Sequence, residues 1–544
     1  MFWTSNNTVA ERFFTSHSTL DTVAFHQAAN QDNGSAGSNA STLLKTNHEQ
    51  FSQDNEALAN PRESEVALMD LPSSETKIRR FKCLGWRATT ECSFDGPPNP
   101  QNDLNCSNSI PKQASGYCEV EDIDTRERFR VMKRSCANTK SGAVFRCSDA
   151  PGFANFRVKA QLAVAQTKKS GFALPNVGAQ SQSPSQGIVM VVYPALVASA
   201  YATIRLLRDV LGCKLPIEIW FSPDEMRKTP GSLTPLQKLN QTTTGDVIFR
   251  EINTNGRPIR FEAKIYAIYH SSFEQVLFLD ADNAPVRDPS FLFETPEFVK
   301  MGAVFWPDYW HPQNTMFYIN TESLVWQLLD TPFVDMFEQE SGQLLIDRRR
   351  HSVPLHLVSF YAFHWPNYFQ LQRLAWGDKD LFRFAWLKLK VPFFMIQTPP
   401  SIAGTVIGWS FCGMTMVQHD THGEVLFLHR NQRKLMGKLH TKLVEAQSKN
   451  QSLVGIEALP DDGYPDPEIW THLLSFRTTS ARSEYIVSGE SLPGFPKWQR
   501  CYGRRDLDRN PHFYAQKFSD LSFGGIEKHL RKFAFEAVQL QQHK

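Results

Sequence analysis

The sequence lacks a charge excess of either sign. Its 58 Lys and Arg residues against 56 Asp and Glu residues leave a net charge of +2 over 544 residues. Because non-specific nucleic-acid binding depends on a strong positive field, no nucleic-acid partner is expected. Hydrophobic residues form 41% and charged residues 21% of the chain, which excludes a collagen, a coiled coil and wholesale disorder.

The chain also has little apolar sequence of membrane-spanning length. Its N-terminus, MFWTSNNTVAERFF, has neither the basic region nor the apolar core of a signal peptide or membrane anchor. One long charge-free apolar stretch, residues 187–204, contains Pro194 and runs into the amphipathic RLLRDVL. That pattern favours a buried strand leading into a helix over a membrane span. An anchor, if the protein is exported, would lie outside this chain.

Closely spaced cysteine pairs of the zinc-binding kind are absent. Six of the nine cysteines fall within 65 residues, and none of the six forms a C-x(2–4)-C pair. This cluster predicts a disulfide framework with 15 possible connectivities and an oxidising compartment. N-glycosylation sequons give weak support for the same compartment. The six cysteines are Cys83, Cys92, Cys106, Cys118, Cys136 and Cys147, and the sequons begin at Asn6, Asn33, Asn39, Asn105, Asn240 and Asn450.

Composition divides the chain into five segments. Residues 1–76 are expected to form a flexible, disordered stem, because 26 of the first 60 residues are Ser, Thr, Asn or Gln. Residues 77–153 are the cysteine-rich module, and 154–186 are expected to be a linker that ends in a polar hinge. Residues 187–432 alternate strand and helix patterns, and 433–544 are expected to extend the same domain.

The alternating region predicts a Rossmann-like α/β fold. Strands are expected at 187–193, 216–221, 246–252 and 275–279, with helices at 200–212 and 261–271. Later helices are expected at 322–346 and 378–390, and a strand at 424–429. In such sheets ligands bind beyond the carboxyl ends of the strands, so polar residues at those ends are the first candidates for a site.

An Asp-x-Asp pair follows one of these strand ends. The pattern occurs four times, but only Asp280 and Asp282 directly follow a continuous apolar strand run, QVLFL. Residues i and i+2 of an extended chain share a face, so both carboxylates can hold one divalent cation. The cation would offset the charge on a departing nucleoside diphosphate. The alternative is that the two aspartates cap the following turn, which Asn283 and Pro285 predict.

The run FEAKIYAIYHSSFEQVLFLDADNAPVRDPSFLFETPEF, followed by GAVFWPDYW, resembles the Golgi α-mannosyltransferase family typified by fungal α-1,3-mannosyltransferases, in a form like that of oomycete proteins. The resemblance covers about residues 187–432. It implies a GT-A nucleotide-diphospho-sugar transferase fold with a mixed sheet, a GDP-mannose donor, Mn²⁺ or Mg²⁺, and retention of anomeric configuration. It also implies a type II membrane protein of the Golgi lumen, with secretion as the alternative.

The resemblance also assigns residues. Asp280 and Asp282 match the metal motif, Lys264 a donor-facing basic residue, and the segment from Glu340 to Gln343 an acceptor-side helix start. In the later acidic motif GDKD, Asp378 and Asp380 are candidates to support a retaining transfer, together with Gln343. The alternative for Asp378 and Asp380 is capping of the next helix, and for Lys264 a solvated helix position.

Three further candidates complete the set. His429 ends a predicted strand and is expected to be the third metal ligand, although a histidine at a strand end is more often simply hydrogen-bonded. Trp306 and Asp308, in FWPDYW, are candidates to bind the donor sugar. A core position is the alternative for Trp306, and ordering of the loop is the alternative for Asp308.

The leading hypothesis is therefore a metal-dependent retaining transfer of mannose from GDP-mannose to a mannose-containing glycan. One alternative keeps the chemistry with a UDP-sugar as donor. A second alternative is a non-catalytic extracellular carbohydrate-binding protein, for which Asp280, Asp282 and the GDKD acids would have no use. A third, an intracellular protein, requires the six clustered cysteines to be reduced.

Overall fold

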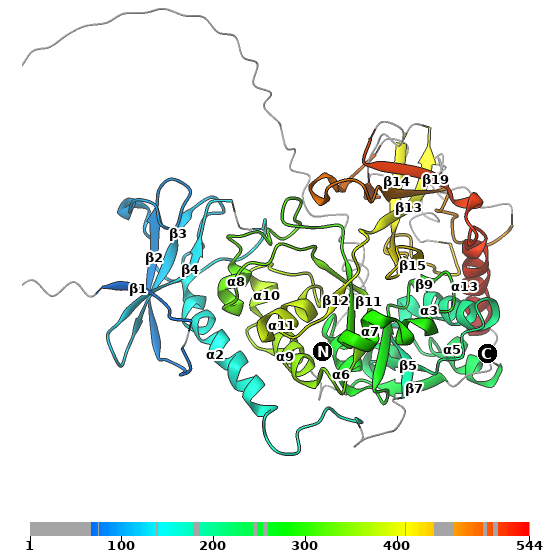
Figure 1. Ribbon diagram of the computed structural model, residues 1–544, viewed down its shortest axis with the longest axis horizontal. Helices are drawn as coiled ribbons and strands as arrows, with labels where there is room; N and C mark the ends of the chain where they lie inside the picture. The colour runs from blue at the N-terminus through cyan, green and yellow to red at the C-terminus, as the bar shows by residue number, and fades with distance from the viewer. Residues whose placement is uncertain are drawn as a thin grey trace, which may run out of the picture. The chain divides into compact units, whose positions relative to one another are not determined.

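The computed structural model describes most of the chain after Ala67 (Figure 1). Its compact unit begins at Leu68, so most of the predicted stem lies outside the described residues. The described part of that stem is not a flexible segment, because Leu68–Asp70 form a strand that pairs with the sheet of the cysteine-rich module. Within them, no helix combines the length and hydropathy that crossing a membrane requires. The described ranges are 67–73, 75–137, 140–177, 185–242, 247–253, 259–408, 410–439, 462–492, 495, 498–503 and 510–542.

The cysteine-rich module is built on a four-stranded sheet with the order β1-β4-β3-β2. The last three strands pair antiparallel, and β1 adds to β4 in parallel. Trp86, Phe129 and Phe145 are buried in its core, with Trp86 and Phe145 packed edge to face. The strands are β1 (Leu68–Asp70), β2 (Phe81–Thr89), β3 (Ser115–Asp122) and β4 (Arg128–Arg134).

The predicted disulfide framework is confirmed, and the structure selects one connectivity. The bonds are Cys83–Cys106, Cys92–Cys136 and Cys118–Cys147. The third bond lies in the core, where both of its cysteines are fully buried. A fourth bond joins Cys412 to Cys501 in the C-terminal half, and Cys213 is a buried free thiol.

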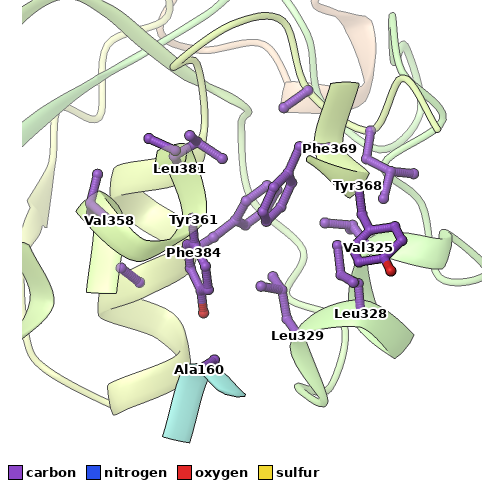
Figure 2. Close-up of a cluster of buried hydrophobic side chains, with 14 of the residues drawn as sticks. Ala160, Val325, Leu328, Leu329, Val358, Tyr361, Tyr368, Phe369, Leu381 and Phe384 are labelled. Carbon is purple, nitrogen blue, oxygen red and sulfur yellow. The ribbon is translucent and has the colours of Figure 1, made fainter. Parts of the chain in front are cut away.

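Helix α2 (Ala150–Gln166) occupies much of the segment that was expected to be a linker. It packs against helices of the following domain in one hydrophobic cluster, in which Ala160 of α2 lies near Leu329, Tyr361 and Phe384 (Figure 2). These partners belong to α8 (Leu324–Leu329), α9 (Ser352–Phe363) and α11 (Leu381–Leu389), and α10 (Tyr368–Leu371) adds Tyr368 and Phe369. The module and the domain therefore share a core.

A seven-stranded mixed sheet forms the centre of the second domain, as predicted. Strands β5 to β8 pair in parallel, and β11 joins the sheet antiparallel to both β8 and β10. This is the mixed Rossmann-like sheet of the predicted GT-A class. Its order is β12 (Phe394–Met395), β10 (Ala303–Pro307), β11 (Gln339–Asp347), β8 (Gln275–Leu279), β5 (Gln186–Val192), β6 (Ile217–Phe221) and β7 (Val247–Glu251).

Strand β8 shows why this sheet needs helices on both faces. Val276 and Phe278 belong to the hydrophobic cluster that includes α6 (Glu262–His270), α9 and α11. Leu277 and Leu279 belong to a second cluster, with α3 (Val197–Arg205) and α13 (Ile526–Gln542). A strand that is buried on both faces has a continuous run of apolar residues, and such a run predicted β8 from the sequence.

The helix predicted at 322–346 is wrong in its second half. Only α8 is helical there, and Gln339–Asp347 form strand β11 between β8 and β10. The segment from Glu340 to Gln343 is therefore not a helix start. Short apolar runs such as QLLI do not distinguish a central strand from a buried helix by periodicity alone.

The C-terminal region completes an eight-stranded sheet in which β13 and β14 are central. Strand β15 pairs with β14 on one side and with β9 on the other, which links this sheet to the chain just after β8. Its strands are β9 (Asn283–Pro285), β13 (Ser401–Ile407), β14 (Ser410–His419), β15 (Val425–His429), β16 (His472–Phe476), β17 (Ser488–Glu490), β18 (Cys501–Gly503) and β19 (Phe513–Lys517). The remaining helices are α4 (Pro223–Arg227), α5 (Thr234–Thr242) and α7 (Pro296–Met301).

Removal of the buried Cys118–Cys147 bond by the double change to Ala should lower the free energy of unfolding by about 3.5 kcal/mol, because the bond closes a loop of 29 residues. Denaturant unfolding of the disulfide-bonded protein measures this loss. The matched control is Cys213→Ala, which removes a buried thiol without removing a cross-link. Equal stability of the control and the double variant would contradict the prediction.

Candidate functional site

Three ligand-type side chains meet at the carboxyl end of β8. Asp280 and Asp282 follow the strand, and His429 ends β15, where it pairs in register with Asn283 of β9. His429 Nε2 lies 3.8 Å from an oxygen of Asp280 and 3.4 Å from an oxygen of Asp282. One ligand atom from each residue lies within 4.8 Å of the other two. The β9–β15 pairing thus brings together residues that are about 150 positions apart in sequence.

The donor atoms of this cluster fit a divalent cation. Two carboxylates and an imidazole suit Mn²⁺, and the carboxylate oxygens also suit Mg²⁺. Gly342 of β11 lets His429 approach, because a Cβ there would lie 2.6 Å from His429 Nδ1. Within the described residues, that buried Nδ1 makes no hydrogen bond, and its nearest carboxylate oxygen, on Glu340, is 3.6 Å away.

Lys264 of α6 is buried beside the cluster. Its Nζ lies 3.2 Å from Asp280 and 3.1 Å from Asp378, and it donates a hydrogen bond of 2.6 Å to the carbonyl of Ser341. Burial lowers the pKa of Lys264, but the carboxylates of Asp280, Asp378 and Glu340 outweigh burial and raise the pKa above its usual value. Lys264 is therefore a charged member of the site and not a solvated helix residue.

Lys434 is a second lysine at the site, and sequence reasoning missed it. Its Nζ forms an ion pair with Asp282, close to the point where the three ligand atoms meet. Burial lowers the pKa of Lys434 to about 8, and Asp280 opposes that shift. The available signal was its position five residues after His429, on the same segment.

The two aspartates of the GDKD loop lie in different environments. Asp378 lies against Lys264 on the side of Asp280. Asp380 belongs to a separate buried group, where Lys379 Nζ lies 3.1 Å from it, 3.2 Å from Asp308, and in an ion pair with Glu338. Asp378 and Lys379, which are adjacent in this loop, thus connect two groups. One is the cation cluster, formed by Asp280, Asp282 and His429, and the other is this second ion-pair network.

Neither aspartate caps the following helix with its side chain. Asp380 occupies the N-cap position of α11 with a φ of 69°, yet its carboxylate accepts hydrogen bonds from the amide of Gln339 at 2.7 Å and from Arg383 Nε at 2.6 Å. Burial raises the pKa of Asp380, but Arg383 and Lys379 outweigh it and lower the pKa overall. Burial raises the pKa of Asp378, although Lys264 opposes the rise.

Gln343 and Glu340 both project from β11 at this end of the sheet. Gln343 lies opposite Leu279 in the β8–β11 register, and its Oε1 accepts a hydrogen bond of 2.6 Å from Asn283. Its buried Nε2 has no hydrogen-bond partner in the part of the chain that the structure describes. Glu340 Oε1 accepts hydrogen bonds from the amides of Ser341 and Gly342. The β11 register therefore places both predicted residues beside the cation cluster.

Trp306 is not brought to the site. It is fully buried, its indole nitrogen donates a hydrogen bond of 2.7 Å to the carbonyl of His419, and its ring packs edge to face with Phe427. The core alternative therefore describes Trp306. Asp308, two residues later, is buried in the network of Lys379.

Comparisons with known proteins find mannosyltransferases among the relatives of this chain. Residues 185–420 match the family model described as “Mannosyltransferase putative”. The chain is 24% identical over 415 residues to “Alpha-1,2-mannosyltransferase MNN5” of Saccharomyces cerevisiae, which covers 66% of this chain and 68% of that protein. “Alpha-1,2-mannosyltransferase MNN2” of the same species is 26% identical over 257 residues, or 41% of this chain and 43% of that protein. The chain is a glycosyltransferase.

Among solved structures, a mannosyltransferase from Pyrobaculum calidifontis in complex with GDP-Man and Mn²⁺ is 16% identical, with a TM-score of 0.25, and covers 45% of this chain and 63% of that chain. The relatives carry α-1,2 names, so the expected typification by α-1,3-mannosyltransferases and the oomycete-like form are not supported.

The buried network makes stability depend on pH through Asp308. Burial raises the pKa of Asp308 to about 7, with Lys379 opposing and Glu340 and Glu338 adding to the rise. Because this pKa exceeds the usual 3.8, the folded protein retains a proton that the unfolded chain has released. The contribution of Asp308 to stability is therefore full below pH 4 and is lost as the pH rises toward 7.

Replacement of Asp308 by Asn should flatten the decline of the free energy of unfolding between pH 4 and 7, which one such group can steepen by up to about 1.4 kcal/mol per pH unit. Denaturant unfolding at several pH values measures the slope. Asp335→Asn is the control, because Asp335 forms an ion pair with Arg482 and is more than half exposed. Equal slopes for wild type and Asp308→Asn would exclude this assignment.

Proposed function

We propose that the protein transfers mannose from GDP-mannose to a mannose-containing glycan in a reaction that depends on Mn²⁺ or Mg²⁺ and retains anomeric configuration. The observation that carries the proposal is the cluster of Asp280, Asp282 and His429 at the carboxyl end of β8. The two aspartates lie inside the stretch that matches the mannosyltransferase model. The mannosyltransferase names of the relatives support mannose as the transferred sugar.

The proposed donor site combines the three cation ligands with two lysines. Asp280, Asp282 and His429 would hold the cation, which supplies electrostatic stabilisation of the diphosphate leaving group. Lys264 forms an ion pair with Asp280, and Lys434 forms one with Asp282. Their ammonium groups would pair with phosphate oxygens that enter the site and offset the same negative charge.

Retention places a polar group near the anomeric carbon while the acceptor attacks from the leaving-group face. Asp378 and Gln343 suit this task, because Asp378 lies at Lys264 and Gln343 has an unused buried donor among the described residues. The three contacts of Asp380, with Lys379, Arg383 and the Gln339 amide, favour a role in positioning the GDKD loop over direct contact with the sugar.

The proposed location is the Golgi lumen, with secretion as the alternative. Four disulfides fit an oxidising compartment, because reducing compartments keep thiols free. A type II anchor belongs to this proposal as a segment outside the present chain.

Calorimetry with GDP-mannose and a panel of UDP-sugars, each with and without Mn²⁺, tests donor and cation together. We expect Mn²⁺-dependent binding of GDP-mannose alone. Asp282→Asn should abolish this binding and reduce transfer by at least about 100-fold, because it removes one charged ligand and the partner of Lys434. The matched control is Asp124→Asn, which alters an Asp-x-Asp pair in the cysteine-rich module.

A preference for a UDP-sugar would keep the fold and overturn the mannosyl donor. Transfer by Asp282→Asn at the wild-type rate with saturating Mn²⁺ would overturn the metal role. Folded wild-type protein that binds none of the donors would favour the non-catalytic carbohydrate-binding alternative.

A further inference from the structure

The cysteine-rich module contacts the segment just before the GDKD loop through its residues 140–144. Arg373, which lies just before that loop, donates a hydrogen bond of 2.9 Å to the carbonyl of Ser141, and Gln372 donates one of 3.1 Å to the carbonyl of Val144. Gly142 has a φ of +77°, and a Cβ there would lie 2.8 Å from the Arg373 guanidinium. The close approach therefore needs glycine at this position.

One aromatic ring, that of Phe317, lies near both a lysine of the module and a lysine of the GDKD loop. Phe317 is buried between two lysines, with Nζ of Lys140 from the module 5.7 Å from its centroid and Nζ of Lys379 5.6 Å away. The ring of Trp376 follows, 6.4 Å from Phe317. A module side chain and a GDKD side chain thus share one aromatic partner, and cation–π contacts of this kind are stabilising.

Trp376 and Phe261 then form a partly exposed aromatic pair beside Asp378. Their centroids are 6.1 Å apart and their planes meet at 62°. Gly377 joins Trp376 to Asp378 with a φ of +61°, and a Cβ there would lie 2.4 Å from the Phe261 ring. Only Gly377 therefore separates Trp376 of the pair from Asp378, a carboxylate of the candidate site.

Polar groups flank the same pair. Glu262 directly follows Phe261, and its Oε1 accepts a hydrogen bond of 2.9 Å from Gln370 Nε2. Aromatic rings with a few polar side chains beside them are the usual composition of sites for small ligands, and the flat faces of such rings suit the apolar face of a pyranose. A sugar on this pair would lie next to Asp378, where an acceptor must arrive.

We propose that Trp376 and Phe261 form the acceptor-glycan subsite and that the 140–144 loop of the cysteine-rich module holds the pair in place. This inference rests on the proposed glycosyl transfer, and it gives the module a role in acceptor binding. The Cys92–Cys136 bond anchors the chain four residues before the loop. Trp376 and Phe261 contact the acceptor, whereas Gly142 and Arg373 are positioning residues.

The test measures steady-state transfer from GDP-mannose to α-linked mannobiose, with the KM of each substrate determined separately. We expect Trp376→Ala to raise the KM for mannobiose on the order of tenfold, because it removes one stacking face. The KM for GDP-mannose should change less than about twofold. Trp376→Phe, which keeps an aromatic ring, should recover part of the loss.

Two further variants separate the subsite from general effects. Trp365→Ala removes a tryptophan that is 86% exposed and belongs neither to the Trp376–Phe261 pair nor to the 140–144 loop, and it should leave both KM values unchanged. The double change of Cys92 and Cys136 to Ala should raise the mannobiose KM in the same direction as Trp376→Ala, because it releases the loop. Calorimetric GDP-mannose binding by each variant establishes that the donor site remains folded.

Equal mannobiose KM values for wild type and Trp376→Ala would overturn the inference while the proposed function stands. A parallel rise in both KM values would also overturn it, because it would indicate a structural effect. If wild-type protein does not bind GDP-mannose, the proposed function fails. Saturation-transfer NMR with mannobiose alone then decides: saturation of mannobiose by wild type that Trp376→Ala loses supports the subsite, and no binding by wild type, or equal saturation by the variant, overturns it.

Discussion

Charge pairing at the carboxyl end of β8 is the constraint on which the rest of the site depends. Asp282 and Asp378 are buried and Asp280 is partly buried where the three carboxylates converge, and Lys264 and Lys434 supply the opposing charge. An unpaired buried charge costs several kcal/mol, so neither partner of such a pair is independent of the other. The sheet register places the carboxylates, while helix α6 and the segment after β15 carry the lysines.

Much of the fold could be predicted because the decisive signals were local. The runs that form β5, β6 and β8 are short, apolar and bounded by turns, and they are buried on both faces of the sheet. The same property defeated the prediction of β11, because a run such as QLLI fits a central strand or a buried helix equally well. The antiparallel pairing of this segment with β8 and β10 makes it a strand, and that pairing could not be inferred from the sequence of the run itself.

The residues of the candidate site also differ in whether the sequence alone could identify them. Asp280 and Asp282 could be found because a strand end is visible in sequence. Lys434 was missed, since its partner Asp282 lies 152 positions away and the available signal was only its position five residues after His429. The disulfide connectivity was open for the same reason: 15 pairings were possible, and strand pairing in the module selects one. Trp306 shows the converse, because residue type alone suggested a ligand contact that burial excludes.

The C-terminal region belongs to the site even though the family match ends at residue 420. The amide of Arg430 donates to the carbonyl of Asp282, and its guanidinium pairs with Glu527 of α13. Glu527 also accepts the amides of Ile469 and Trp470. The segment that carries the site's histidine and second lysine is therefore held between the Asp-x-Asp turn and the last helix. The candidate cation site, to which His429 would contribute its imidazole, thus depends on a helix about 100 residues downstream.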